Sequence, residues 1–266
     1  MTKVLLLVHD DPGQEARIQV AVALARALPD ARLHCLDVSP YPTVYDPGWS
    51  LAPPMVIDET EAEAANSARV RERIAGEGID WRWHKQRGDF GDCLMAAAQV
   101  VNIIVLNRRF DGSRRPDMIG LVSRVLTHSP ALVIAVDPER RTFDLARPAI
   151  VAWDGSPKVL GALERALPML TLATRVVLFQ AGSLPKAALP ADAGLRKLAE
   201  HGIAAEVEID ADAKDPVLAI IAAAKRLGAG YCVMGGFSHS RLREALLGGV
   251  SRDLLTCASL PLVMAH

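Results

Sequence analysis

Residues 4–12 read Val-Leu-Leu-Leu-Val-His-Asp-Asp-Pro. Five apolar residues without interruption are typical of a short strand that is buried on both faces of a sheet. Aspartate is favoured at a helix N-cap, and proline suits the first helical position because its missing N–H would have no partner there. The stretch therefore predicts a strand over residues 4–8 and a helix that begins near Pro12 with Asp11 as its cap.

The same alternation of strand and helix continues to the end of the chain. Further strands are expected over about residues 32–38, 81–86, 103–106, 132–136, 149–153, 175–179, 205–209, 231–234 and 261–265. Helices are expected over about 12–28, 58–76, 89–100, 157–170, 191–202 and 216–227, and two more should end near residues 128 and 257. A proline-rich loop separates the second strand from the next helix. This order predicts parallel sheets with helices on both faces.

The order of elements begins again after residues 137–141. Residues 9–12, His-Asp-Asp-Pro, parallel residues 153–157, Trp-Asp-Gly-Ser-Pro, with one residue inserted. Residues 120–124, Gly-Leu-Val-Ser-Arg, parallel residues 248–252, Gly-Gly-Val-Ser-Arg. Two matches in the same order of elements indicate an internal duplication. We expect two tandem domains, residues 1–137 and 148–266, each with a five-stranded, parallel, doubly wound sheet.

Composition excludes several classes of partner. The formal net charge is -1, from 30 basic and 31 acidic residues, so no basic excess favours nucleic acid or an anionic membrane. Residues 4–8 are too few for a signal-peptide core, and no apolar run approaches the roughly 20 residues of a membrane span. We expect a soluble cytoplasmic protein. The four separated cysteines are expected to be core residues, and the seven histidines show no metal-ligand spacing.

Candidate ligand-binding residues gather at predicted strand ends in the second half. In open α/β sheets, ligands bind at the carboxyl ends of strands where strand order reverses. Asp154 follows the first strand of this half, Gly235-Gly236 follow the fourth, and residues 248–251 come shortly after. Glycine lets the backbone approach a bulky anion, helix N-termini bind phosphate, and a carboxylate accepts from ribose or adenine. Plainer interpretations remain: Asp154 in a turn before the Ser156 cap, and the glycine pair as an ordinary turn.

These residues carry a resemblance to the universal stress proteins. ATP-binding members have Gly, two residues, Gly, nine residues, Gly and then Ser or Thr, with an Asp after the first strand. At this spacing the present chain has Gly235, Ser238, Gly248 and Gly249, with Asp154 at the acidic position. Ser238 replaces a glycine and Gly249 replaces the hydroxyl residue, for which Ser251 could partly substitute. The nucleotide site implied by the resemblance is Asp154, Gly235, Ser238, Gly248, Gly249, Val250 and Ser251.

The first half departs further from the family pattern. Residues 107–111, Asn-Arg-Arg-Phe-Asp, replace its glycine-rich segment. We therefore expect ATP, or another adenine nucleotide, in the second half alone. The resemblance implies an adenine-nucleotide α-hydrolase-like, Rossmann-like fold and a stress-response or signalling protein with no catalytic residues and no obligatory turnover. Its partner protein and any homodimer of the whole chain stay open.

Two other functions remain open. The chain could be an interaction scaffold that binds no nucleotide, which the degenerate first half and Ser238 would suit. It could also be an ATP-using adenylating enzyme, because residues 154–156, Asp-Gly-Ser, resemble the Ser-Gly-Gly loop of those enzymes, although the glycine pair is missing. The serines lack a nucleophile-elbow sequence, which argues against a hydrolase. Arg241 and Arg243 suit a solvated face better than a phosphate clamp.

The final strand of each half is strongly apolar. Residues 132–136 read Leu-Val-Ile-Ala-Val and residues 261–265 read Pro-Leu-Val-Met-Ala. An exposed edge of this kind invites aggregation unless something covers it. Domains of the family commonly pair through their final strands, and a tandem chain resembles that dimer within one polypeptide. We expect the two strands to pair antiparallel as a pseudo-dimer, although a helix over each edge would meet the same need.

Overall fold

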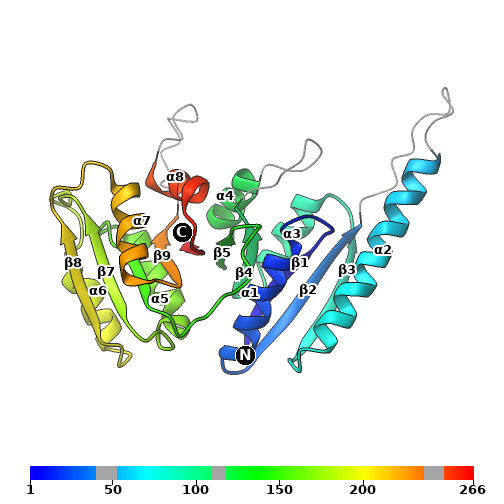
Figure 1. Cartoon of the computed structure of the whole chain (residues 1–266), viewed down its shortest axis with the longest axis horizontal. Helices are drawn as coiled ribbons and strands as arrows, with labels where there is room; N and C mark the ends of the chain where they lie inside the picture. Colours follow the sequence, from blue (N-terminus) through cyan, green and yellow to red (C-terminus); the bar gives the residue numbers. More distant parts are fainter. Residues whose placement is uncertain (40–52, 109–117, 237–248) are drawn as a thin grey trace.

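The computed structural model describes residues 1–39, 53–108, 118–236 and 249–266. Its strands form one 10-stranded sheet with helices on both faces (Figure 1). The strands are β1 Thr2–Val8, β2 Ala31–Ser39, β3 Trp81–Arg87, β4 Ile103–Asn107, β5 Leu132–Val136, β6 Ala149–Ala152, β7 Val176–Ala181, β8 Ala205–Asp210, β9 Tyr231–Gly235 and β10 Leu262–Ala265. The helices are α1 Gln14–Ala27, α2 Pro53–Ala75, α3 Phe90–Ala98, α4 Met118–His128, α5 Pro157–Leu170, α6 Ala191–Ala199, α7 Pro216–Leu227 and α8 Val250–Cys257.

Strand order shows two copies of one topology joined at the middle of the sheet. The order is β3-β2-β1-β4-β5-β10-β9-β6-β7-β8, and pairing within each half is parallel. Each half thus has five parallel strands, as the sequence predicted. Residues of two helices in each half enter each of the two apolar clusters, so α1, α2, α5 and α6 cover one face while α3, α4, α7 and α8 cover the other.

The final strands pair antiparallel, which confirms the expected pseudo-dimer. Val263 of β10 lies opposite Ile134 of β5, and Leu262 and Met264 lie opposite Ala135 and Val133. All of these residues are at most 1% exposed. The two apolar edges therefore cover one another, and no helix is needed over either of them.

Most helix ends follow from local chemistry. The Ser156 hydroxyl accepts from the Val159 N–H at 3.2 Å, and the Asp215 carboxylate accepts from the Val217 N–H at 2.8 Å. Both are followed by proline at the first helical position, as expected. Gly228 ends α7 in the left-handed conformation, with φ of 62°, which glycine adopts without strain.

The start of α1 corrects one sequence prediction. The helix begins at Gln14, its N-cap is Gly13, and Asp11 is not the cap. The Asp11 carboxylate accepts from the Gly13 N–H at 2.8 Å and forms a fully buried ion pair with Arg17. Because the buried Arg17 guanidinium requires a counter-charge, the Asp11 carboxylate pairs with it and does not cap α1. The next helix, α2, also begins earlier than the expected residue 58, at Pro53.

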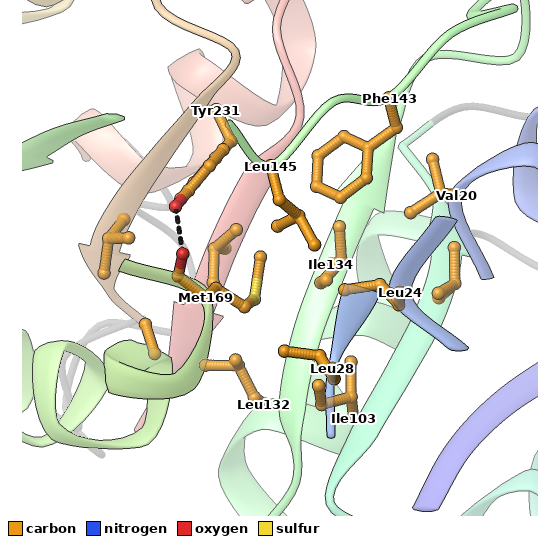
Figure 2. Packing of buried hydrophobic residues seen from close by; sticks show 14 of the residues in the cluster. Val20, Leu24, Leu28, Ile103, Leu132, Ile134, Phe143, Leu145, Met169 and Tyr231 are labelled. Atoms are coloured by element: carbon orange, nitrogen blue, oxygen red, sulfur yellow. Dashed lines mark hydrogen bonds between the residues drawn. The ribbon is translucent and has the colours of Figure 1, made fainter. Parts of the chain in front are cut away.

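The segment between the halves is itself part of the core. Phe143 and Leu145 are 8% and 4% exposed and belong to the same apolar cluster as α1 and α5. Figure 2 shows both side chains between Tyr231 on one side and Val20 on the other. The rings of Phe143 and Tyr231 have centroids 6.0 Å apart, and the Tyr231 hydroxyl donates to the Met169 carbonyl at 3.0 Å. This segment therefore holds the two halves together through side-chain packing.

Strand registers define equivalent positions in the two halves. Val4 pairs with Ile103 in the first half, and Ala149 pairs with Tyr231 in the second. Counting forward from Val4 and Ala149 brings Pro12 onto Pro157 with no gap. The inserted residue that the sequence comparison suggested is therefore not needed, and the residue equivalent to Asp154 is His9, not Asp10. Equivalent strand residues also face the same cluster, which supports this superposition.

Candidate functional site

A cavity of about 490 Å³ lies at the carboxyl ends of β6, β7 and β9. In the sheet, β7 and β8 lie on one side of β6 while β9 and β10 lie on the other, so strand order reverses beside this cavity. This is the position at which open α/β sheets bind ligands. Four of the residues predicted from sequence line it: Asp154, Gly235, Val250 and Ser251.

The other predicted residues stand apart from this group. Gly249 is the N-cap of α8 in an extended conformation, and it is not among the cavity-lining residues. Ser238 and Gly248 lie outside the described residues, so their predicted roles stay predictions. The cavity therefore joins the first-strand aspartate, the fourth-strand glycine and the start of α8, although these segments are far apart in sequence.

Asp154 lies in a tight turn at the cavity mouth. Its carboxylate accepts from the Ser156 N–H at 2.9 Å, and its side chain is exposed. Gly155 has φ of +69°, and a Cβ there would lie 2.6 Å from the Leu189 carbonyl oxygen. The turn is thus specific to glycine. Asp154 therefore does form a turn before Ser156, as the plainer interpretation expected. Its other carboxylate oxygen takes no part in this hydrogen bond and is available to a ligand.

Gly235 allows β9 and α5 to approach closely. A Cβ at this position would lie 3.0 Å from the Val159 nitrogen and 3.1 Å from the Lys158 Cβ. On the other side, the Ser251 hydroxyl donates to the Gly235 carbonyl at 3.3 Å, which ties the start of α8 to the end of β9. Glycine is therefore required here by packing against α5.

The cavity wall is mainly apolar. Phe179, Met234 and Ile220 line it, and the Trp153 indole N–H donates to the Leu189 carbonyl at 3.1 Å. Among the described lining residues there is one carboxylate and no lysine or arginine. Lys158 stands nearby in α5; burial lowers the pKa of its ammonium, and the Asp154 carboxylate acts in the opposite direction. Such a wall suits a flat, uncharged ring better than a cluster of negative charges.

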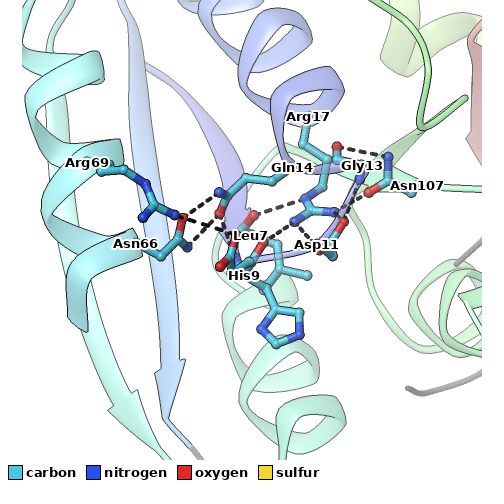
Figure 3. Close-up of polar contacts among 10 residues, drawn as sticks. Leu7, His9, Asp11, Gly13, Gln14, Arg17, Asn66, Arg69 and Asn107 are labelled. Carbon is cyan, nitrogen blue, oxygen red and sulfur yellow. Dashed lines mark hydrogen bonds and ion pairs between the residues drawn. The ribbon is translucent and has the colours of Figure 1, made fainter. Parts of the chain in front are cut away.

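The first half has a buried guanidinium at the carboxyl ends of β1 and β4, which sequence reasoning missed. Arg17 has no solvent exposure, and its side chain donates to the Asp11 carboxylate and to the Leu7 and His9 carbonyls at 2.7–3.1 Å (Figure 3). It also donates to the Asn107 side chain, whose amide donates to the Gly13 carbonyl at 3.2 Å. The sequence contained one indication of this buried cluster, because Arg17 is a charged residue on the apolar face of a predicted helix.

This polar cluster extends toward α2. The Gln14 amide donates to Asn66 at 2.7 Å and its carbonyl oxygen accepts from the His9 N–H at 3.0 Å, as drawn in Figure 3. Side chains of α1, β4 and α2 therefore form hydrogen bonds with one another, with Asp11 and with backbone carbonyls at the switch point of the first half. Asn107 stands at the register position of Gly235, which lines the cavity of the second half. That the first half lacks the family's nucleotide site stays a prediction.

Two further features bear on the class of protein. Over residues 1–39, 53–108, 118–236 and 249–266, no group of three or more His, Cys, Asp or Glu side chains could hold a metal ion. Within the same residues, every helix is too short or too polar to cross a bilayer.

Comparison with known proteins gives fold relatives only. No protein-family model and no curated protein matches the chain. A universal stress protein of Archaeoglobus fulgidus matches with a TM-score of 0.73 at 19% identity, over 99% of this chain and 95% of that one. A Pseudomonas aeruginosa protein of unknown function matches at 0.61 and 15%, over 100% and 92%. The cytoplasmic domain of a prokaryotic cation chloride cotransporter matches at 0.53 and 12%, over 99% and 94%.

The match to the Archaeoglobus protein covers both halves of this chain and nearly all of a chain of similar length. Together with the two five-stranded halves joined through β5 and β10, it confirms the resemblance that the glycine-rich segment suggested. This chain has the tandem, Rossmann-like α/β fold of the universal stress proteins.

Proposed function

We propose that this chain is a stress-response or signalling protein of the universal stress type that binds an adenine nucleotide in its second half. The observation that carries the proposal is the cavity at the β6–β9 switch point, where Asp154, Gly235, Val250 and Ser251 line one space. Its apolar wall suits a purine, and the free carboxylate oxygen of Asp154 can accept from a ribose hydroxyl or an adenine amino group.

ATP is the proposed nucleotide. The first N–H groups of a helix have no intrahelical partner, and they favour negative charge. The start of α8 at Gly249 and Val250 brings such groups to the cavity. The phosphates would lie at the start of α8, close to Gly248, which the sequence predicts to be part of the site. Binding would change the surface shown to a partner protein, without obligatory turnover. We place this activity in the cytoplasm, with residues 1–137 and 148–266 as the two domains.

The test is nucleotide content and stoichiometry. Purified full-length protein is denatured, and the released small molecules are separated and identified; calorimetric titration with ATP then counts sites on nucleotide-free protein. We expect one adenine nucleotide per chain. A stoichiometry of two would contradict the expectation of a site in the second half alone, and the absence of binding to ATP, ADP, AMP and cyclic AMP would refute the proposal.

A scaffold that binds no nucleotide is the second candidate. It is favoured by the lack of lysine and arginine among the described lining residues. The same titration separates the two, because a scaffold takes up no nucleotide yet still binds its partner. An adenylating enzyme would release pyrophosphate from ATP in the presence of a substrate, which neither of these candidates does.

A further inference from the structure

The segment that joins the halves lies in a groove beside the carboxyl-terminal half of α1 and the start of β9. Phe143 packs between Val20 and Tyr231 (Figure 2). Arg147 donates to the Gly228 carbonyl at 2.8 Å, and a Cβ at Gly230 would lie 2.8 Å from the Arg147 Cβ. The groove is therefore fitted closely to a chain segment that carries an aromatic side chain.

Because the molecule is a pseudo-dimer, this groove has an equivalent on the other side. The strand registers place Ile103 at the position of Tyr231, and Asn102 and Val100 at the positions of Gly230 and Gly228. Counting into the helices places Arg165 of α5 at the position of Val20 in α1. Five of the seven buried positions of α1 coincide with buried positions of α5 under this superposition, which supports it.

The equivalent groove is open. A cavity of about 540 Å³ lies between the halves and is lined by residues that include Ile103, Asn102, Val100 and Arg165. A chain with one connecting segment can fill only one of two equivalent grooves. Val100 at the rim is 64% exposed, which is unusual for a large apolar side chain in this structure.

The open groove differs from the filled one in charge. Arg165 stands where the filled groove has Val20, and Lys3 stands where it has Pro148. Arg165 donates to the His266 carbonyl at 3.2 Å and Lys3 donates to the Val100 carbonyl at 3.3 Å. These bonds use one donor of each cation, so further N–H groups remain for an acceptor. Two cations beside an aromatic-sized space favour an acidic ligand with one apolar anchor.

We propose that the open groove binds an acidic segment of a partner protein. The segment places an aromatic side chain over Ile103, as Phe143 lies over Tyr231, and its carboxylates face Lys3 and Arg165. The connecting segment shows how a groove of this kind takes a length of chain with an aromatic anchor, and the two cations give the charge of the partner. This inference is independent of nucleotide binding in the second half.

The test uses the full-length protein and a fluorescent synthetic peptide. The peptide copies residues 142–146, Thr-Phe-Asp-Leu-Ala, after two added glutamates. We expect saturable binding by fluorescence anisotropy that weakens as salt rises. Arg165→Glu should weaken binding at least about tenfold, because the carboxylates then meet a like charge. Arg196→Glu, an exposed charge reversal on α6, is the matched control and should leave the affinity unchanged.

A second peptide separates groove binding from simple charge attraction. Replacing its phenylalanine with alanine should also weaken binding at least about tenfold, since the aromatic anchor is lost. The proposal is overturned if no binding is seen up to about 1 mM peptide. It is also overturned if Arg165→Glu binds like the parent protein, or if the alanine peptide binds as well as the original. Equal melting temperatures of the variants check that the fold is intact.

Discussion

Asn107 in β4 and Gly235 in β9 occupy equivalent register positions. Each half has one glycine where this strand end meets the start of a helix, but the glycine belongs to the helix start in the first half and to the strand in the second. In the first half the strand provides Asn107 and the helix start provides Gly13, where a Cβ would lie 2.5 Å from the Asn107 amide nitrogen. In the second half the strand provides Gly235 and the helix start provides Lys158. Asn107 forms hydrogen bonds within the buried Arg17 cluster, whereas Gly235 lines the cavity of the second half.

Gly235→Asn should therefore destabilise the protein. The helix start has no glycine opposite this position, and the new Cβ would lie 3.1 Å from the Lys158 Cβ. Overpacking of this kind costs about 1–3 kcal/mol, measured as a lower denaturation midpoint in urea. Gly161→Ala is the control, because the nearest side-chain atom to its new Cβ is 3.5 Å away. Equal stability of Gly235→Asn and the parent would contradict the packing role of Gly235.

Gly248→Leu should abolish nucleotide binding if the glycine-rich segment holds phosphate as the sequence predicts. The added side chain would fill the space that phosphates need, so affinity should fall by at least about 100-fold, which corresponds to about 2.8 kcal/mol. Calorimetric titration with ATP measures the change. An affinity equal to that of the parent would remove Gly248 from the predicted site.

Loss of the Arg17 guanidinium should destabilise the first half strongly. Arg17→Met leaves the Asp11 carboxylate buried without its counter-charge, and breaking a buried pair of this kind costs about 3–5 kcal/mol. Urea denaturation measures the loss. The double variant Arg17→Met with Asp11→Ala should recover part of it, since no buried charge is left. If the double variant is no more stable than the single one, the carboxylate is not the source of the cost.

Residues 138–266 expressed alone should dimerise or aggregate. This fragment loses β5, so β10 would expose Val263 and Met264, which are fully buried in the whole chain. Sedimentation or light scattering measures association. Leu262→Glu or Met264→Glu should disturb it, because a charge would enter an apolar strand edge. A monomeric fragment that is indifferent to both changes would show that the second half is stable without its partner strand.

Acid should destabilise the protein partly through His34. Its ring stacks on His84 with centroids 5.0 Å apart, and burial, followed by the charges of His84, Lys3, Arg32 and Arg82, lowers its pKa from 6.5 to about 4. Between these values the unfolded chain binds the proton and the folded chain does not. Stability therefore falls as pH drops from 6.5 toward 4 and stops changing on this account below that range.

The variant that checks this prediction is His34→Val, because the equivalent residue of the second half is Val177. Its stability, measured in urea from pH 7 to pH 4, should fall less steeply than that of the parent. His128→Val, an exposed histidine on α4, serves as the control. If the stability of the parent and that of His34→Val change equally with pH, protonation of His34 does not contribute to stability between pH 7 and pH 4.

Local sequence pattern determined the elements of this protein and their joining. Apolar runs such as residues 4–8 and 132–136 report burial on both faces, and Ser156 and Asp215 satisfy helix N–H groups from within their own turns. The apolar character of both final strands, together with the resemblance to a family whose domains pair through these strands, predicted the antiparallel pairing of β5 with β10. Each of these inferences needs only neighbouring residues or one repeated pattern.

Only the tertiary structure decided which spaces are filled. Arg17 meets Asn107 across 90 residues of sequence, and Phe143 covers Val20 from a segment with no periodicity of its own. Whether a side chain occupies a crevice depends on the strand register and on how closely helix and strand approach. Neither can be read from the local periodicity of apolar residues. The sequence by itself therefore determined two equivalent halves, and packing made them unlike: the first half buries Arg17 at the position of Ala162, and the connecting segment fills one of two equivalent grooves.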